Sequence, residues 1–210
     1  MSSAPVAPFA VRHVQLVRAL VAALAAAMVT FAPDKSYVVG LTIFAGFAIT
    51  SGLLLIVAAF LVGDRTRRGP YILIGAFDVV AGMFASVQPM QSSVALLVLL
   101  ISWAAITGIS EFFVGFADRR AGRDRVVARD HMFAGALSVL LAALVAFVPP
   151  AYSLDYFIEE AGRSFTLSGE IIMVGLFGGY AAILAVYLAI AGLSPQPVPA
   201  ADPIHEKDPA

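Results

Sequence analysis

The sequence predicts an all-α membrane protein with six transmembrane helices, arranged as three parallel-repeat helical hairpins. The first reason is composition, because 60% of the 210 residues are hydrophobic and only 13% are charged, about half the charged fraction of a soluble domain. The second is a set of six apolar stretches, each close to the roughly 20 residues that a bilayer-spanning helix needs. The third is an internal repeat that pairs these stretches.

The six stretches define one transmembrane domain over residues 13–193. Two connections, "APDKS" and "QPMQSS", are short and contain a proline, as expected where a helix stops and the chain reverses. The expected hairpins are therefore 13–62, 70–117 and 132–193, between a short segment 1–12 and a disordered proline-rich tail 194–210. We expect the first stretch to be a retained helix and not a removed signal peptide. The six stretches lie at about 13–32, 38–62, 70–88, 93–117, 132–148 and 170–193.

The cations divide unequally between the two sides of the predicted bundle. Only Lys35 and Arg163 lie on one side. The positive-inside rule then predicts that the other side, which carries both termini, faces the cytoplasm. The expected location is the cytoplasmic membrane. The eleven cations on that side are Arg12, Arg18, Arg65, Arg67, Arg68, Arg119, Arg120, Arg123, Arg125, Arg129 and Lys207.

Two longer connections carry further expectations. The segment 118–130, "DRRAGRDRVVARD", is expected to be a cytoplasmic loop that anchors the topology, with a contact to anionic lipid or a partner as the alternative. In the outer loop 149–168, Ser153 and Gly162 bracket apolar residues at helical spacing. We expect a short amphipathic helix on the membrane surface there, with a binding lid as the alternative.

A repeat of hairpins indicates how the helices pack. An offset of 56 residues places Pro33 on Pro89, Gly52 on Gly108 and Phe60 on Phe116, and a further offset of 60 places Gly75 on Gly135. Each unit holds two spans, so all copies have the same orientation and a pseudo-threefold axis is expected. Small residues recur every seven positions and mark helix faces that can approach closely inside the bundle. The pairs are Gly75 and Gly82, Gly108 and Gly115, Gly135 and Ala142, and Gly52 and Ala59.

Two acids stand on these small-residue faces. Asp78 lies between Gly75 and Gly82, and Glu111 lies between Gly108 and Gly115. Acids within a membrane span are costly unless partnered, so they mark either a protonatable site or an interhelical docking contact. The sequence leaves the charge state open and slightly favours docking.

The sequence also offers partners for these acids. Arg68 or Arg119 is expected to reach Glu111, to which Thr107 and Ser110 could donate hydrogen bonds. Ala22 and Ser138 occupy the positions equivalent to Asp78, so a symmetric charged filter is not expected. Glu170 is expected to cap the helix that it opens.

Several chemistries have no sequence support. The chain has no cysteine, and its three histidines show no metal-ligand spacing. No Ser/His/Asp set or phosphate-binding glycine loop appears, so we expect no enzyme activity, no metal and no cofactor. Trp103 is expected to be an interface or packing residue. The expected partners are the lipid bilayer and, as candidates, other membrane proteins or further copies of the chain, but no nucleic acid.

The middle hairpin resembles the HdeD family of acid-resistance membrane proteins. The resemblance rests on a Gly-rich first helix with Gly75 and Asp78, a turn at Pro89, and Trp103 before Gly108 and Ile109. It implies a six-span cytoplasmic-membrane protein linked to acid or general stress, without a catalytic residue or transport substrate to carry over. The sequence thus supports two hypotheses: a non-enzymatic stress-tolerance protein, or a proton-coupled transporter or channel that uses Asp78 and Glu111.

Overall fold

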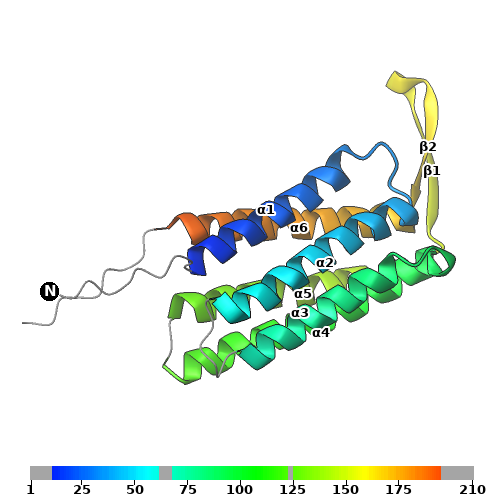
Figure 1. Ribbon diagram of the computed structural model, residues 1–210. Coiled ribbons are helices and arrows are strands. Elements are labelled where there is room, and N and C mark those ends of the chain that lie inside the picture. Colours follow the sequence, from blue (N-terminus) through cyan, green and yellow to red (C-terminus); the bar gives the residue numbers. More distant parts are fainter. Residues whose placement is uncertain (1–10, 62–67, 123–124, 195–210) are drawn as a thin grey trace, which may run out of the picture.

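The computed structural model describes residues 11–61, 68–122 and 125–194, and within them six long helices form one bundle (Figure 1). All six are long and apolar enough to cross a membrane, which confirms the predicted fold class of an all-α membrane protein with six spans. The helices are α1 (Val11–Phe31), α2 (Tyr37–Leu61), α3 (Arg68–Ala85), α4 (Ser93–Arg120), α5 (Arg125–Ala146) and α6 (Gly169–Leu193).

Consecutive helices run antiparallel, so three hairpins (α1–α2, α3–α4 and α5–α6) stand in the same orientation. The second helices, α2, α4 and α6, contact one another at the centre of the bundle. The first helix of each hairpin packs more extensively on the central helix of a neighbouring hairpin than on its own: α1 on α6, α3 on α2, and α5 on α4. The hairpins therefore interlock instead of standing side by side.

The short turns have clear local causes. A 3-10 turn, η2 (Gln88–Met90), contains Pro89 and separates α3 from α4. Ser92 then caps α4, because its side chain accepts a hydrogen bond from the backbone N–H of Ala95. Both predicted proline turns are thus present as tight reversals.

Glycines allow the closest helix contacts. A Cβ atom on Gly75 would lie 2.6 Å from the carbonyl oxygen of Gly52, and one on Gly135 would lie 2.5 Å from that of Gly108. Since real Cβ atoms essentially never come so close to another atom, only glycine fits at these crossings of α2 with α3 and of α4 with α5. Gly82 and Gly115 make similar approaches to the carbonyl oxygens of Ala45 and Ala128.

The central helices bury residues in equivalent layers. Positions 47, 103 and 177, which are 56 and then 74 residues apart, hold aromatic side chains, and the Phe47 ring meets the other two edge to face. The same offsets relate Ser51, Thr107 and Ala181 one turn further along, and Phe44, Leu100 and Val174 one turn before, all of them buried. The second offset is longer because the third hairpin contains an inserted segment.

That inserted segment is a β-hairpin, so the predicted amphipathic helix is wrong. Strands β1 (Ser153–Ile158) and β2 (Arg163–Ser168) pair antiparallel through the turn η3 (Glu159–Ala161), and Gly162 adopts φ +62°. Leu154, Tyr156 and Ile158 alternate at strand spacing, and two paired strands satisfy more backbone groups than one isolated helical turn. The β-hairpin projects beyond one end of the helices (Figure 1).

At the opposite end, called the arginine-rich end below, helices reach into the segment expected to be a loop. Helix α4 continues to Arg120, and α5 begins at Arg125, seven residues before the predicted start at 132. Helical turns outside the hydrocarbon need not be apolar, and burial of Asp130 against other helices stabilises the first turns of α5. The proline-rich tail beyond Ser194 lies outside the described residues.

Candidate functional site

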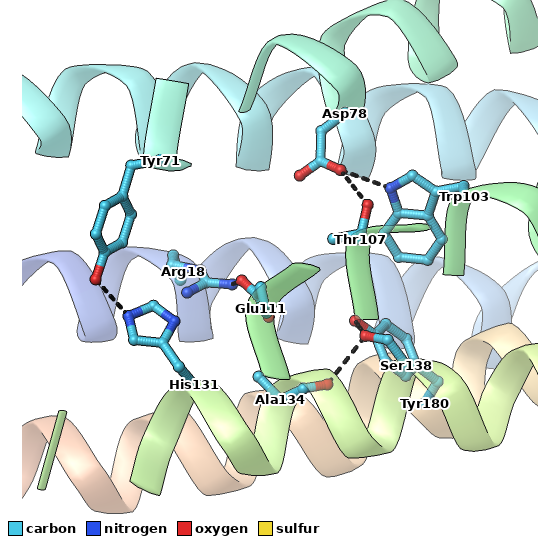
Figure 2. Close-up of polar contacts among 10 residues, drawn as sticks. All are labelled: Arg18, Tyr71, Asp78, Trp103, Thr107, Glu111, His131, Ala134, Ser138 and Tyr180. Carbon is cyan, nitrogen blue, oxygen red and sulfur yellow. Dashed lines mark hydrogen bonds and ion pairs between the residues drawn. The ribbon is translucent and has the colours of Figure 1, made fainter. Parts of the chain in front are cut away.

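Asp78 lies inside the bundle, with 3% of its surface exposed. Its Oδ1 atom accepts hydrogen bonds from Trp103 Nε1 at 2.8 Å and from Thr107 Oγ1 at 3.0 Å, as Figure 2 shows. Both donors belong to α4, one helical turn apart, so the carboxyl group ties α3 to the central helix of its own hairpin. Trp103 is 2% exposed and is therefore an interior residue, not an interface one.

Glu111 is equally buried and has a different partner from the expected ones. Its Oε1 atom accepts a hydrogen bond from Arg18 Nη2 at 2.8 Å. Arg18 belongs to α1, so this ion pair joins the first hairpin to the second. The sequence places Arg18 among the charges that set the topology and predicts Arg68 or Arg119 as the partner of Glu111. That prediction was wrong because Arg18 lies two turns inside α1, on a face directed into the bundle.

The dipeptide Asp130–His131 at the start of α5 forms a third set of contacts that the sequence did not reveal. Asp130 accepts hydrogen bonds from Gln15 of α1 and from the Tyr187 hydroxyl of α6, the latter at 2.8 Å. His131 Nε2 lies 2.6 Å from the Tyr71 hydroxyl of α3. These contacts connect α5 to three other helices near the arginine-rich end. Their only sequence signal is that two ionisable residues precede the apolar stretch directly.

The third hairpin keeps a weaker form of the Asp78 contact. Ser138 occupies the position equivalent to Asp78 and is 1% exposed. Its hydroxyl donates to the Ala134 carbonyl oxygen at 3.0 Å, so the Tyr180 hydroxyl, also 3.0 Å away, is the donor to Ser138. The equivalent position in the first hairpin is the fully buried Ala22. Polar contacts at this level therefore occur in two of the three repeats.

These side chains form a polar row that occupies one half of the interior. Figure 2 shows it running from Tyr71 and His131, past Arg18 and Glu111, to Asp78 and Thr107. Asp78 is ten residues from the start of α3, which places it about 15 Å along the helix. The other half of the interior is filled by a cluster of five aromatic rings, each in contact with at least two others at centroid distances of 5.1–6.4 Å. These rings are Phe44, Phe47, Trp103, Phe177 and Tyr180.

Beyond the aromatic rings, Glu170 joins the beginnings of the central helices. It accepts hydrogen bonds from the backbone N–H of Tyr37 at the start of α2, at 3.0 Å, and from the Ser93 hydroxyl at the start of α4. Its own helix is capped by Ser168, whose hydroxyl accepts from the Ile171 N–H. The prediction that Glu170 caps its own helix, α6, was thus wrong, because its carboxylate accepts from the N-terminus of α2 instead.

The chemistry of the polar row is that of contact between helices. Its two acids accept from donors on adjacent helices, which is the arrangement that offsets the cost of burying them. Within the described ranges, no three His, Asp or Glu side chains lie close enough together to hold a metal ion.

Comparison with known proteins identifies a repeat at the level of sequence families. A family model described as "Short repeat of unknown function (DUF308)" matches residues 17–87 and again 73–148. The two matches begin 56 residues apart, the same offset that relates the first two hairpins. They do not extend to the β-hairpin or to α6. Neither a curated protein nor a solved structure matches the chain.

Proposed function

This chain belongs to the DUF308 family of short repeats, and we propose that it acts as a non-enzymatic multi-pass membrane protein of HdeD type. HdeD-like membrane proteins belong to this family, and the middle hairpin carries the residues of that resemblance. The proposed role is tolerance of acid or envelope stress, exerted through contacts with partner membrane proteins or further copies of the chain. The proposal includes no substrate, metal or cofactor.

The observation that carries this proposal is the partnering of the interior acids. Asp78 accepts from Trp103 and Thr107, and Glu111 pairs with Arg18. Both acids hold helices together, and a layer of aromatic side chains separates them from the β-hairpin end. A bundle held in this way suits a scaffold better than a solute path, which needs polar access to both surfaces.

We also propose that the arginine-rich end faces the cytoplasm and that the β-hairpin faces outward. Arg18 does not count among the cations of the cytoplasmic side, because it pairs with Glu111 inside the bundle. Ten cations then remain on the proposed cytoplasmic side, against Lys35 and Arg163 on the other. This bias is still strong enough to orient the helices by the positive-inside rule.

Substitution of Asp78 tests the docking role against proton handling. Asp78→Asn keeps a carbonyl oxygen that can accept from both donors, whereas Asp78→Ala leaves the Trp103 and Thr107 donors unsatisfied, at a cost of about 1–3 kcal/mol. We expect Asp78→Asn to keep wild-type folded yield and acid survival, and Asp78→Ala to lower both. Folded yield is measured by size-exclusion of the solubilised protein, and survival by plating after an acid shock. Normal yield with lost survival in Asp78→Asn would contradict docking.

One observation supports a second candidate, a proton-coupled transporter or channel. The polar row reaches from the arginine-rich end to the middle of the bundle and contains His131, Glu111 and Asp78 (Figure 2). A proton relay needs such a chain of ionisable groups. This candidate predicts proton uptake by proteoliposomes that is lost in Asp78→Asn, while the folded yield is unchanged.

A further inference from the structure

An apolar groove of about 430 Å³ lies between α1 and α2 at the β-hairpin end of the bundle. Met28 and Phe31 of α1 form one wall, Val39 and Thr42 of α2 form the other, and the buried Ile43 lies at its base. The Thr42 hydroxyl donates to the Val38 carbonyl oxygen within its own helix, so it presents no unsatisfied polar group. The groove exists because α1 packs mainly on α6 and only lightly on α2.

The groove opens towards the bilayer. Met28 is 55% and Phe31 is 84% exposed, and both belong to α1, which is long and apolar enough to cross a membrane. A Cβ atom on Gly46, one turn beyond Thr42, would meet no atom within 4 Å, so the open surface continues towards the membrane centre. An acyl chain is the occupant that such a surface accepts at no cost in polar contacts.

A charged turn stands at the mouth of this groove. The Lys35 ammonium group donates to the Ala32 carbonyl oxygen at 3.4 Å, and Ala32 itself lines the groove. The neighbouring Asp34 carboxylate accepts from the backbone N–H and the hydroxyl of Ser36, which holds it in place beside the lysine. Asp34 is exposed and Lys35 is half-buried, so the turn presents one carboxylate and one ammonium group beside the groove.

We propose that the groove and this turn bind one phospholipid with a zwitterionic headgroup that carries a primary ammonium group. The acyl chain lies between α1 and α2, the phosphate binds Lys35, and the headgroup ammonium donates hydrogen bonds to Asp34. The Asp34 carboxylate disfavours a headgroup of net negative charge. A quaternary ammonium has no N–H to donate, so a carboxylate discriminates against it. The proposal is independent of the stress-tolerance role.

Lipid retention by the purified full-length protein tests this inference. Delipidated protein in detergent is incubated with phosphatidylethanolamine, phosphatidylcholine or phosphatidylglycerol of the same acyl chains, and bound lipid is counted by native mass spectrometry. We expect one phosphatidylethanolamine to be retained at least about tenfold more tightly than the other two, the ratio that one charge-assisted hydrogen bond supplies. Equal retention of the three lipids, or preference for phosphatidylglycerol, would overturn the proposal.

Matched variants localise the site. Lys35→Gln removes the phosphate contact and Thr42→Phe fills the groove, and each is expected to weaken retention about tenfold. Their controls are Arg163→Gln, which removes the other cation of this end, and Val98→Phe at the position equivalent to Thr42 in the second hairpin, where Val98 is also exposed. Both controls should retain the lipid. Thr42, Val98 and Arg163 are exposed and Lys35 is half-buried, and a thermal melt verifies that each variant is folded. Unchanged retention in Lys35→Gln and Thr42→Phe would place the lipid elsewhere.

Discussion

Arg18 and Glu111 illustrate how single residues hold this bundle together. Their side chains are 14% and 4% exposed, and they meet at 2.8 Å across two hairpins. Removing one partner of a buried ion pair leaves an uncompensated charge and costs about 3–5 kcal/mol, whereas replacing both by apolar residues is often nearly neutral. The pair therefore contributes more to which helices adjoin than to net stability.

A double-substitution cycle tests this reasoning. We expect Arg18→Met and Glu111→Met to lower the thermal unfolding midpoint strongly as single changes, and the double variant to recover most of the loss. The midpoint is followed by tryptophan fluorescence in detergent, since Trp103 lies in the interior. Arg119→Met, at an exposed cation near the end of α4, is the matched control. Additive losses in the double variant would show that the two side chains do not interact.

At the scale of helices, backbone contact through glycine decides where the hairpins cross. A Cβ atom on Gly135 would lie 2.5 Å from both the Gly108 carbonyl oxygen and the Phe112 amide nitrogen. Neither backbone group can move without separating α4 from α5. In lipid, where apolar side chains gain little by leaving the solvent, this loss of close packing is not replaced by other contacts.

A single methyl group is therefore expected to be harmful at one glycine and harmless at another. Gly135→Ala should lower stability by about 1–3 kcal/mol through overpacking. Gly179→Ala should be tolerated, because a Cβ atom there meets nothing within 4 Å. Thermal midpoints of the two purified variants give the comparison. Equal midpoints would mean that α4 and α5 can separate slightly without loss.

The element that sequence periodicity misread is the β-hairpin. Residues 153–158 satisfy helical spacing through Leu154, Phe157 and Ile158, and strand spacing through Leu154, Tyr156 and Ile158. Residues 163–168 favour the strand, because they pair with residues 153–158 in a register that runs from Ser153–Ser168 to Ile158–Arg163. A pattern in one segment cannot report such pairing, because the second strand supplies half of the hydrogen bonds.

At the scale of the whole molecule, the asymmetry of charge between the two ends predicts the orientation. The chain has no cysteine, so single introduced cysteines report accessibility without background. Ser164→Cys in β2 should react with a membrane-impermeant maleimide in intact cells. Ala121→Cys, between α4 and α5, should react only after permeabilisation. The opposite labelling pattern would invert the topology. Both residues are exposed, so lack of reaction is not due to burial.

The amino-acid order alone predicts the six spans, the repeat offset of 56 residues, and the two acids on small-residue helix faces. These are local properties, since the bilayer thickness sets the span length and each acid is placed by neighbours on its own helix. Observed and predicted helix ends agree within three residues except at the start of α5, where polar residues are buried by other helices.

The bonding partners of the buried acids depend on which helices, distant in the sequence, pack against one another. Glu111 pairs with Arg18, 93 positions away, and Glu170 reaches Tyr37, 133 positions away. The first contact depends on α1 packing mainly against another hairpin, and the second depends on the meeting of the central helices α2 and α6. Periodicity indicates which face of a helix is turned inward, but the bonding partner depends on which other helix approaches that face.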